Sequence, residues 1–124
     1  MCIRDRTRRE QAGWWLAELP VGEGAPRRFD AVAVAGVDKR QSPGGSDLDD
    51  FRSSVAEGND VELIEVKKEL NEQVVGQLLA GAPMFSEEYP GHGELSLTAC
   101  VKKPGDEAIE WFRKRSGINL EIAS

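Results

Sequence analysis

The segment that most constrains the fold covers residues 61–81, VELIEVKKELNEQVVGQLLAG, because it joins two different periodicities. Its first half predicts a β-strand, whose side chains point alternately to opposite faces. Its second half, Asn71–Ala80, carries valines and leucines at three- and four-residue spacing, which predicts a helix. A strand that leads into a helix is a building unit of α/β sheets, and the other elements must fit around it.

The predicted strand places two charges where a core is expected. Because strand side chains alternate, Glu65 and Lys67 share the face of Val61 and Leu63. A charge in apolar surroundings costs free energy unless it is paired or binds a ligand. The end of this strand is therefore a candidate functional site.

The rest of the chain alternates strands with helices. We expect a helix over Arg8–Leu19 that ends before Pro20, since the residue before a proline disfavours helix. Further strands are predicted over Arg27–Val37, Glu94–Lys102 and Ile118–Ile122, further helices over Asp47–Ala56 and Glu107–Ser116, and loops over most of Asp38–Asp60 and over Pro83–Gly93. This alternation predicts an α/β fold.

Length and composition fit one domain over residues 1–124. No apolar run approaches the roughly 20 residues of a membrane span. Residues 1–7 fit no pattern, and the first six, MCIRDR, look like translated sequencing-adapter carry-over. We expect residues 1–7 to be non-native or disordered and the native N-terminus to be truncated. Cys2 and Cys100 form neither a disulfide framework nor a zinc motif, so we expect a cytoplasmic protein.

Charge and histidine content restrict the function. The formal net charge of −6 argues against a protein that coats nucleic acid through a basic surface. It leaves room for a nucleic-acid enzyme with a local acidic metal site and local basic clusters. The single histidine, His92, lies in a Pro-Gly-His-Gly sequence that is typical of a turn, so histidine-based catalysis is disfavoured.

Two carboxylates and a lysine fit the chemistry of phosphodiester hydrolysis. Asp30 lies near the start of its predicted strand, and with Glu65 it offers the hard oxygen ligands that Mg²⁺ prefers. The Val66 backbone carbonyl could add another oxygen. Lys67 could orient or deprotonate a water, or neutralise the charge on a pentavalent phosphate. A metal-activated water that attacks a phosphodiester needs these groups in one pocket.

Asp30 followed by Glu65-Val66-Lys67 resembles the D…ExK signature of the PD-(D/E)XK nuclease superfamily. Gln77 matches a glutamine that many members carry on the next helix, and the strand-helix-strand tail also looks similar. The resemblance implies a restriction-endonuclease-like α/β fold with a central mixed sheet of about four to five strands flanked by helices. It implies a DNA nuclease dependent on Mg²⁺, or alternatively Mn²⁺, with Asp30, Glu65 and Val66 on the metal.

The chain also departs from this pattern. Phe29, rather than proline, precedes Asp30. The superfamily's additional acid on the first helix would be Glu10, with Glu18 as second choice. Each match has an ordinary explanation: a Glu65–Lys67 salt bridge, an Asp30–Arg28 pair and a surface amide at Gln77.

Other functions therefore stay open. The same fold with a decayed site would be a non-enzymatic module that binds nucleic acid or protein. An unrelated α/β domain would be a subunit of a larger assembly. We expect DNA as the partner, with RNA as the open alternative, no membrane partner, and a homodimer or partner subunit because a chain this small has little surface to grip a duplex.

Overall fold

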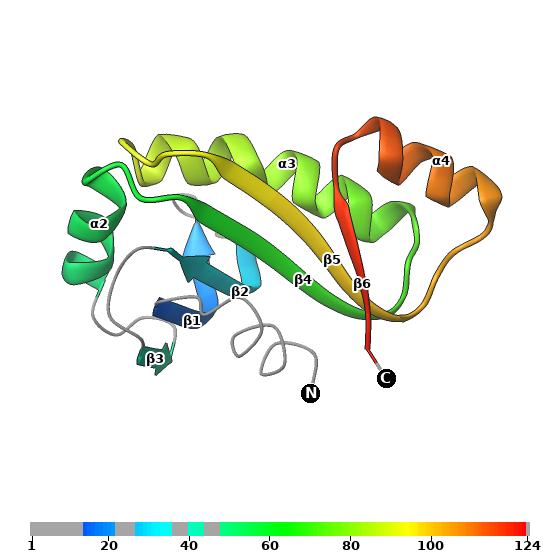
Figure 1. Ribbon diagram of the computed structural model, residues 1–124, viewed down its shortest axis with the longest axis horizontal. Helices are drawn as coiled ribbons and strands as arrows, with labels where there is room; N and C mark the ends of the chain where they lie inside the picture. Colours follow the sequence, from blue (N-terminus) through cyan, green and yellow to red (C-terminus); the bar gives the residue numbers. More distant parts are fainter. Residues whose placement is uncertain (1–13, 22–26, 36–39, 44–47, 124) are drawn as a thin grey trace.

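The computed structural model describes residues 14–21, 27–35, 40–43 and 48–123, which form a six-stranded sheet with helices packed on it (Figure 1). The strands are β1 (Trp14–Val21), β2 (Arg27–Val34), β3 (Arg40–Pro43), β4 (Val61–Glu69), β5 (Leu95–Lys103) and β6 (Asn119–Ile122). The helices are α2 (Leu48–Ala56), α3 (Glu72–Glu88) and α4 (Glu107–Arg115).

The strands follow the order β3-β1-β2-β4-β5-β6 and make a mixed sheet. β2 pairs antiparallel with both β1 and β4, whereas β4, β5 and β6 run parallel to one another and β3 runs parallel to β1. The predicted α/β class, a mixed sheet flanked by helices, is confirmed. The described residues form six strands rather than about four to five, because β1 and β3 come from segments predicted as helix and loop.

The predicted helix Arg8–Leu19 is wrong over residues 14–19, which form most of β1. Its residues 8–13 lie outside the described part of the chain. A short run such as WWLAEL is apolar enough for either element, and aromatic residues favour strands. Strand pairing determines that this segment is a strand and not a helix. β1 forms an antiparallel ladder with β2, in which Leu16 pairs with Val32. Helix periodicity alone could not reveal that partner.

Helix α3 continues to Glu88, so the predicted loop is wrong over its first six residues. A proline inside a helix costs about 3 kcal/mol or more, and Pro83 is such a residue. The helix continues because its last turns are buried: Phe85 and the C-cap residue Tyr89 stack at 5.0 Å and both meet Phe51 of α2 edge-on. The Tyr89 N–H closes the helix on the Phe85 carbonyl at 2.8 Å.

The main core lies between α3 and one face of the sheet. Val74 and Leu78 of α3 pack in one buried cluster with Val32 of β2 and Leu63 of β4. Figure 1 shows α3 running along β4 and β5, with α4 beside β6. A smaller cluster that includes Ile64 lies on the opposite face, as strand alternation requires.

The other predicted elements agree with the structure to within a few residues at their ends: β2, α2, β4, β5, α4 and β6. Capping residues fix two helix starts. The Asn71 side chain accepts from the Val74 N–H at 3.0 Å, and the Asp106 side chain accepts from the Ile109 N–H at 3.0 Å. In the described ranges, no helix is long and apolar enough to cross a bilayer.

Candidate functional site

The antiparallel register of β2 and β4 brings Asp30 and Glu65 together. Ala31 pairs with Ile64, so the next residues along the two strands, Asp30 and Glu65, face each other. Side chains that face each other in such a ladder have Cβ atoms roughly 5 Å apart. The sequence separates these carboxylates by more than thirty residues, and the sheet makes them neighbours.

The two strands part at this point. Ladder pairing between β2 and β4 covers Ala31–Val34, whereas β4 continues beside β5 as far as Glu69. We call this divergence the fork. At the fork a side chain takes the place of a backbone partner from β2. The Asp30 Oδ2 accepts a hydrogen bond from the Val66 N–H at 2.7 Å.

Burial and the neighbouring acid change the protonation of Glu65. Its side chain is only 5% exposed, and its pKa is raised from 4.5 to about 7. Burial is the largest cause of this shift. The charge of Asp30 and a side-chain hydrogen bond with Asp30 also contribute to the rise, while Lys67 and a backbone hydrogen bond from Asp30 oppose it. With its pKa near 7, Glu65 is largely protonated below neutral pH when no cation is bound.

Lys67 follows on the same face of β4 and is exposed. Its charge lowers the pKa of Glu65, but within the described residues it forms no ion pair. The alternative explanation of a Glu65–Lys67 salt bridge is therefore wrong. The side chain of Arg28, the alternative partner of Asp30, lies outside the described part.

Gln77 has a buried polar atom without a partner. Its Oε1 is buried and accepts no hydrogen bond in the described structure, which is unusual for a buried polar group. It lies one helical turn before Gly81, where a Cβ would come 2.5 Å from the Phe29 ring. Helix α3 thus approaches the strand segment that carries Asp30, and Gln77 is not a plain surface amide.

The carboxylates of Asp30 and Glu65 are the candidate ligands for a metal ion. Among the described residues, no group of three or more His, Cys, Asp and Glu side chains could hold a metal. Mg²⁺ is commonly bound by one or two carboxylates with waters, and the facing Asp30 and Glu65 offer that set. Asp30 and Glu65 therefore fit Mg²⁺. Glu10 and the side chain of Glu18 lie outside the described part, although Glu18 is in β1 rather than in the predicted helix.

Two polar arrangements were not foreseen from the sequence. His92 is bound at both ring nitrogens, to the Ser86 hydroxyl at 2.8 Å and to the Gly93 carbonyl at 2.7 Å, which fits a turn that is held in place. Glu62, on the opposite face from Glu65, is 9% exposed and accepts from the Thr98 hydroxyl at 2.5 Å. Strand alternation could have identified Glu62, because it shares the face of Ile64.

No protein-family model, no curated protein and no solved structure matches the chain.

Proposed function

We propose that the chain is a Mg²⁺-dependent nuclease of restriction-endonuclease-like fold that hydrolyses phosphodiester bonds of DNA. The observation that carries the proposal is the pair of facing carboxylates at the fork, Asp30 and Glu65. Two like charges that face each other in a sheet are destabilising. A cation between them would remove that cost, so the pair is better suited to binding an ion than to holding the sheet together.

Each residue has a role in this proposal. Asp30 and Glu65 would hold Mg²⁺ or Mn²⁺, with the Val66 carbonyl as a further oxygen, and the ion would lower the pKa of a bound water and offset phosphate charge. Asp30 also fixes the Val66 backbone through its 2.7 Å hydrogen bond. Glu10 is the proposed additional acid.

Lys67 is the proposed electrostatic catalyst. It lies two residues after Glu65 on the same strand face, and no carboxylate of the described residues occupies its amine. An ammonium group that is not engaged can donate to a phosphate oxygen and offset the charge that develops there. The unpartnered Gln77 Oε1 would accept a hydrogen bond from a water or an ammonium group.

A plasmid-nicking assay tests the proposal. Wild type should cut with Mg²⁺ and not with EDTA, and Lys67→Ala should cut roughly a hundredfold more slowly, since removal of one charge-stabilising donor typically costs that much. Lys114→Ala is the matched control, because Lys114 is an exposed lysine on α4 and should leave the rate unchanged. If wild type does not cut, or if Lys67→Ala cuts as fast, the enzyme proposal is wrong.

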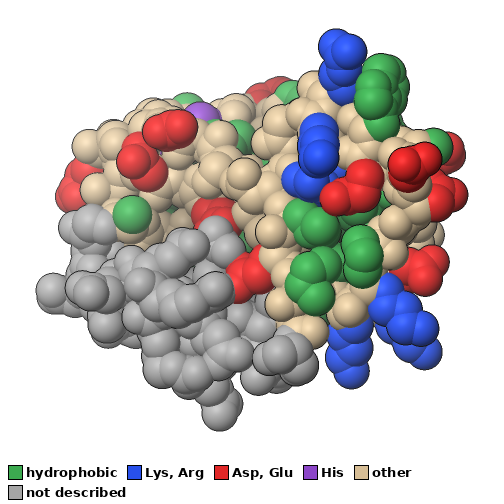
Figure 2. Space-filling view, turned by 45° about the vertical axis from the view of Figure 1, so that its right-hand side comes forward, with side chains coloured by type: hydrophobic (Ala, Val, Ile, Leu, Met, Phe, Trp, Pro, Cys, Tyr) green, Lys and Arg blue, Asp and Glu red, His purple; other side chains and the backbone are tan. Residues whose placement is uncertain are grey.

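A second candidate function is a subunit of a larger assembly or a homodimer without catalysis. Two large apolar side chains favour it: Trp111 on α4 is 61% exposed and Ile122 on β6 is 49% exposed. Figure 2 shows hydrophobic side chains gathered between basic groups on the face in view. Light scattering should then give a mass above that of one chain, and calorimetric titration of wild type with MgCl₂ should give no heat of binding.

A further inference from the structure

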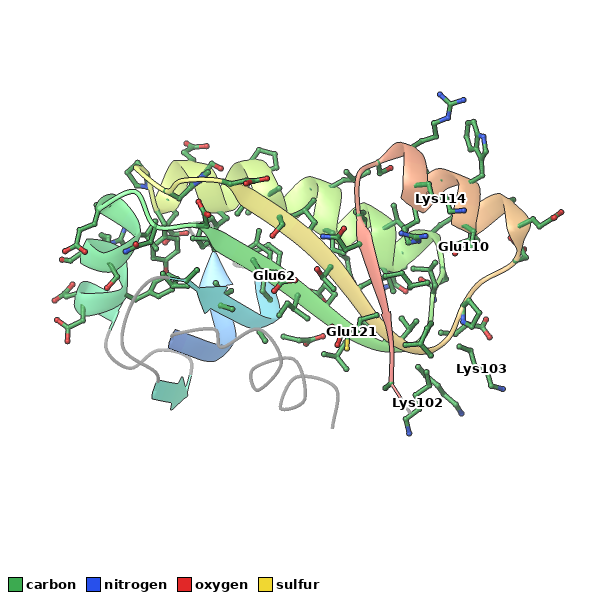
Figure 3. All side chains as sticks on the ribbon, viewed as in Figure 1. Glu62, Lys102, Lys103, Glu110, Lys114 and Glu121 are labelled. Carbon is green, nitrogen blue, oxygen red and sulfur yellow. The ribbon has the colours of Figure 1, made fainter. Side chains whose placement is uncertain are left out.

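Strands β4 and β5 both end in consecutive lysines. β4 carries Lys67 and Lys68, and β5 carries Lys102 and Lys103. Because the two strands run parallel, their lysines meet at one end of the sheet, which we call the lysine end. Figure 3 shows Lys102 and Lys103 projecting from the end of β5, away from α4.

The strand register sets two of these lysines side by side. Lys67 pairs with Val101 and Glu69 with Lys103, so Lys68 lies beside Lys102 on the same face of the sheet. Parallel neighbours are roughly 5 Å apart, and like charges at that separation are destabilising. Alternation puts Lys67 and Lys103 on the other face, so cations surround the end of the sheet.

The described residues supply little to compensate these charges. All four lysines are exposed, and within the described residues none forms an ion pair. Glu69 lies beside Lys103 in the register, and Glu121 of β6 lies beside Cys100, two residues before Lys102. In a chain of net charge −6, four lysines at one end that form no ion pair within the described residues are a local exception that favours a polyanion.

We propose that Lys68 and Lys102, on the face of the sheet opposite Glu65 and Lys67, bind phosphates of a nucleic-acid duplex that extends around the lysine end from the cleavage site. This inference rests on the proposed function for its substrate, because the lysine end begins at Lys67, two residues after Glu65. Phosphates that bridge Lys68 and Lys102 would offset the repulsion between the two amines. Contacts of this kind position a duplex without reading its sequence.

Fluorescence anisotropy with a labelled DNA duplex in EDTA measures this binding without cleavage. Lys68→Gln/Lys102→Gln should weaken binding roughly tenfold near 50 mM salt and reduce the slope of log K against log salt by about 2, one for each lost phosphate contact. Lys68→Arg/Lys102→Arg should bind as wild type does, because it keeps both charges.

The matched control is Lys114→Gln/Arg115→Gln, which removes two exposed cations from α4 and should change the affinity by less than about twofold. Equal losses in both double variants, no loss in Lys68→Gln/Lys102→Gln, or no duplex binding by wild type would overturn the inference. Binding to anionic phospholipid vesicles in place of the duplex would overturn it as well. Because cleavage is absent in EDTA, binding that depends on Lys68 and Lys102 supports the inference even when no Mg²⁺-dependent nicking occurs.

Discussion

Two glutamates of β4, Glu62 and Glu65, are both buried, yet they have different neighbours. Glu62 accepts a hydrogen bond from the neutral Thr98 hydroxyl of β5. Glu65 faces Asp30, a second acid, and its pKa rises to about 7. The comparison teaches that burial does not by itself identify a functional carboxylate. A buried acid that faces another acid needs a cation to offset the charge of the pair. Such a pair therefore indicates a functional site.

The largest expected difference between the two glutamates is in catalysis. Glu65→Gln should lower Mg²⁺-dependent nicking at least roughly a hundredfold, because an amide is a poor ligand for a hard cation. Glu62→Gln should stay within about fivefold of wild type, because its amide oxygen still accepts from Thr98. Initial nicking rates at equal protein concentration measure both. Equal losses of nicking rate in Glu65→Gln and Glu62→Gln would mean that the fork has no special role in catalysis.

The next difference is in the pH dependence of stability. Because the pKa of Glu65 is raised from 4.5 to about 7 on folding, the folded state keeps a proton that the unfolded state loses. Stability is therefore fully present below pH 4.5 and falls as the pH rises toward 7, by about 3 kcal/mol in all for such a shift.

Glu65→Gln should remove this loss. In EDTA, its free energy of unfolding at pH 8 should exceed that of wild type by about 1 to 3 kcal/mol, with little difference at pH 4.5. Urea unfolding at the two pH values is the measurement, and Glu62→Gln is the control. A wild-type stability that rises from pH 4.5 to 8, with no gain in Glu65→Gln, would contradict the prediction.

The smallest expected effect comes from Thr98→Val, which makes Glu62 more like Glu65. It removes the hydroxyl donor and leaves the buried carboxylate with one hydrogen bond fewer, at a cost of about 1 to 3 kcal/mol. Urea unfolding at neutral pH measures the change. Thr98→Ser keeps the hydroxyl and should recover most of the stability. Stability unchanged in Thr98→Val would mean that the hydroxyl contributes nothing to the burial of Glu62.

The elements that the sequence predicted well have a local cause. The faces of β4 and the start of α3 follow from alternation, from apolar spacing and from the Asn71 cap, which lie within one segment. The elements that it predicted poorly depend on distant partners. β1 is a strand because it pairs with β2, and α3 passes Pro83 because Phe85 and Tyr89 are buried against α2.

The site follows the same rule. Asp30 and Glu65 could be chosen from the sequence because each places a charge on an apolar strand face. That they face each other depends on β2 and β4 being antiparallel neighbours, and no residue within either strand encodes that pairing. The partner of Glu62 was missed for the same reason, since Thr98 lies on β5.

The fork has a consequence for self-association. Beyond Ile64, and within the described residues, no strand pairs with the side of β4 that β2 leaves, and Asp30 binds the Val66 N–H there. An open strand edge invites pairing with another chain. Lysines disfavour such pairing, and Lys67 and Lys68 lie on this stretch. The charges proposed to attract a polyanion would therefore also help to keep the protein from aggregating when no ligand is bound.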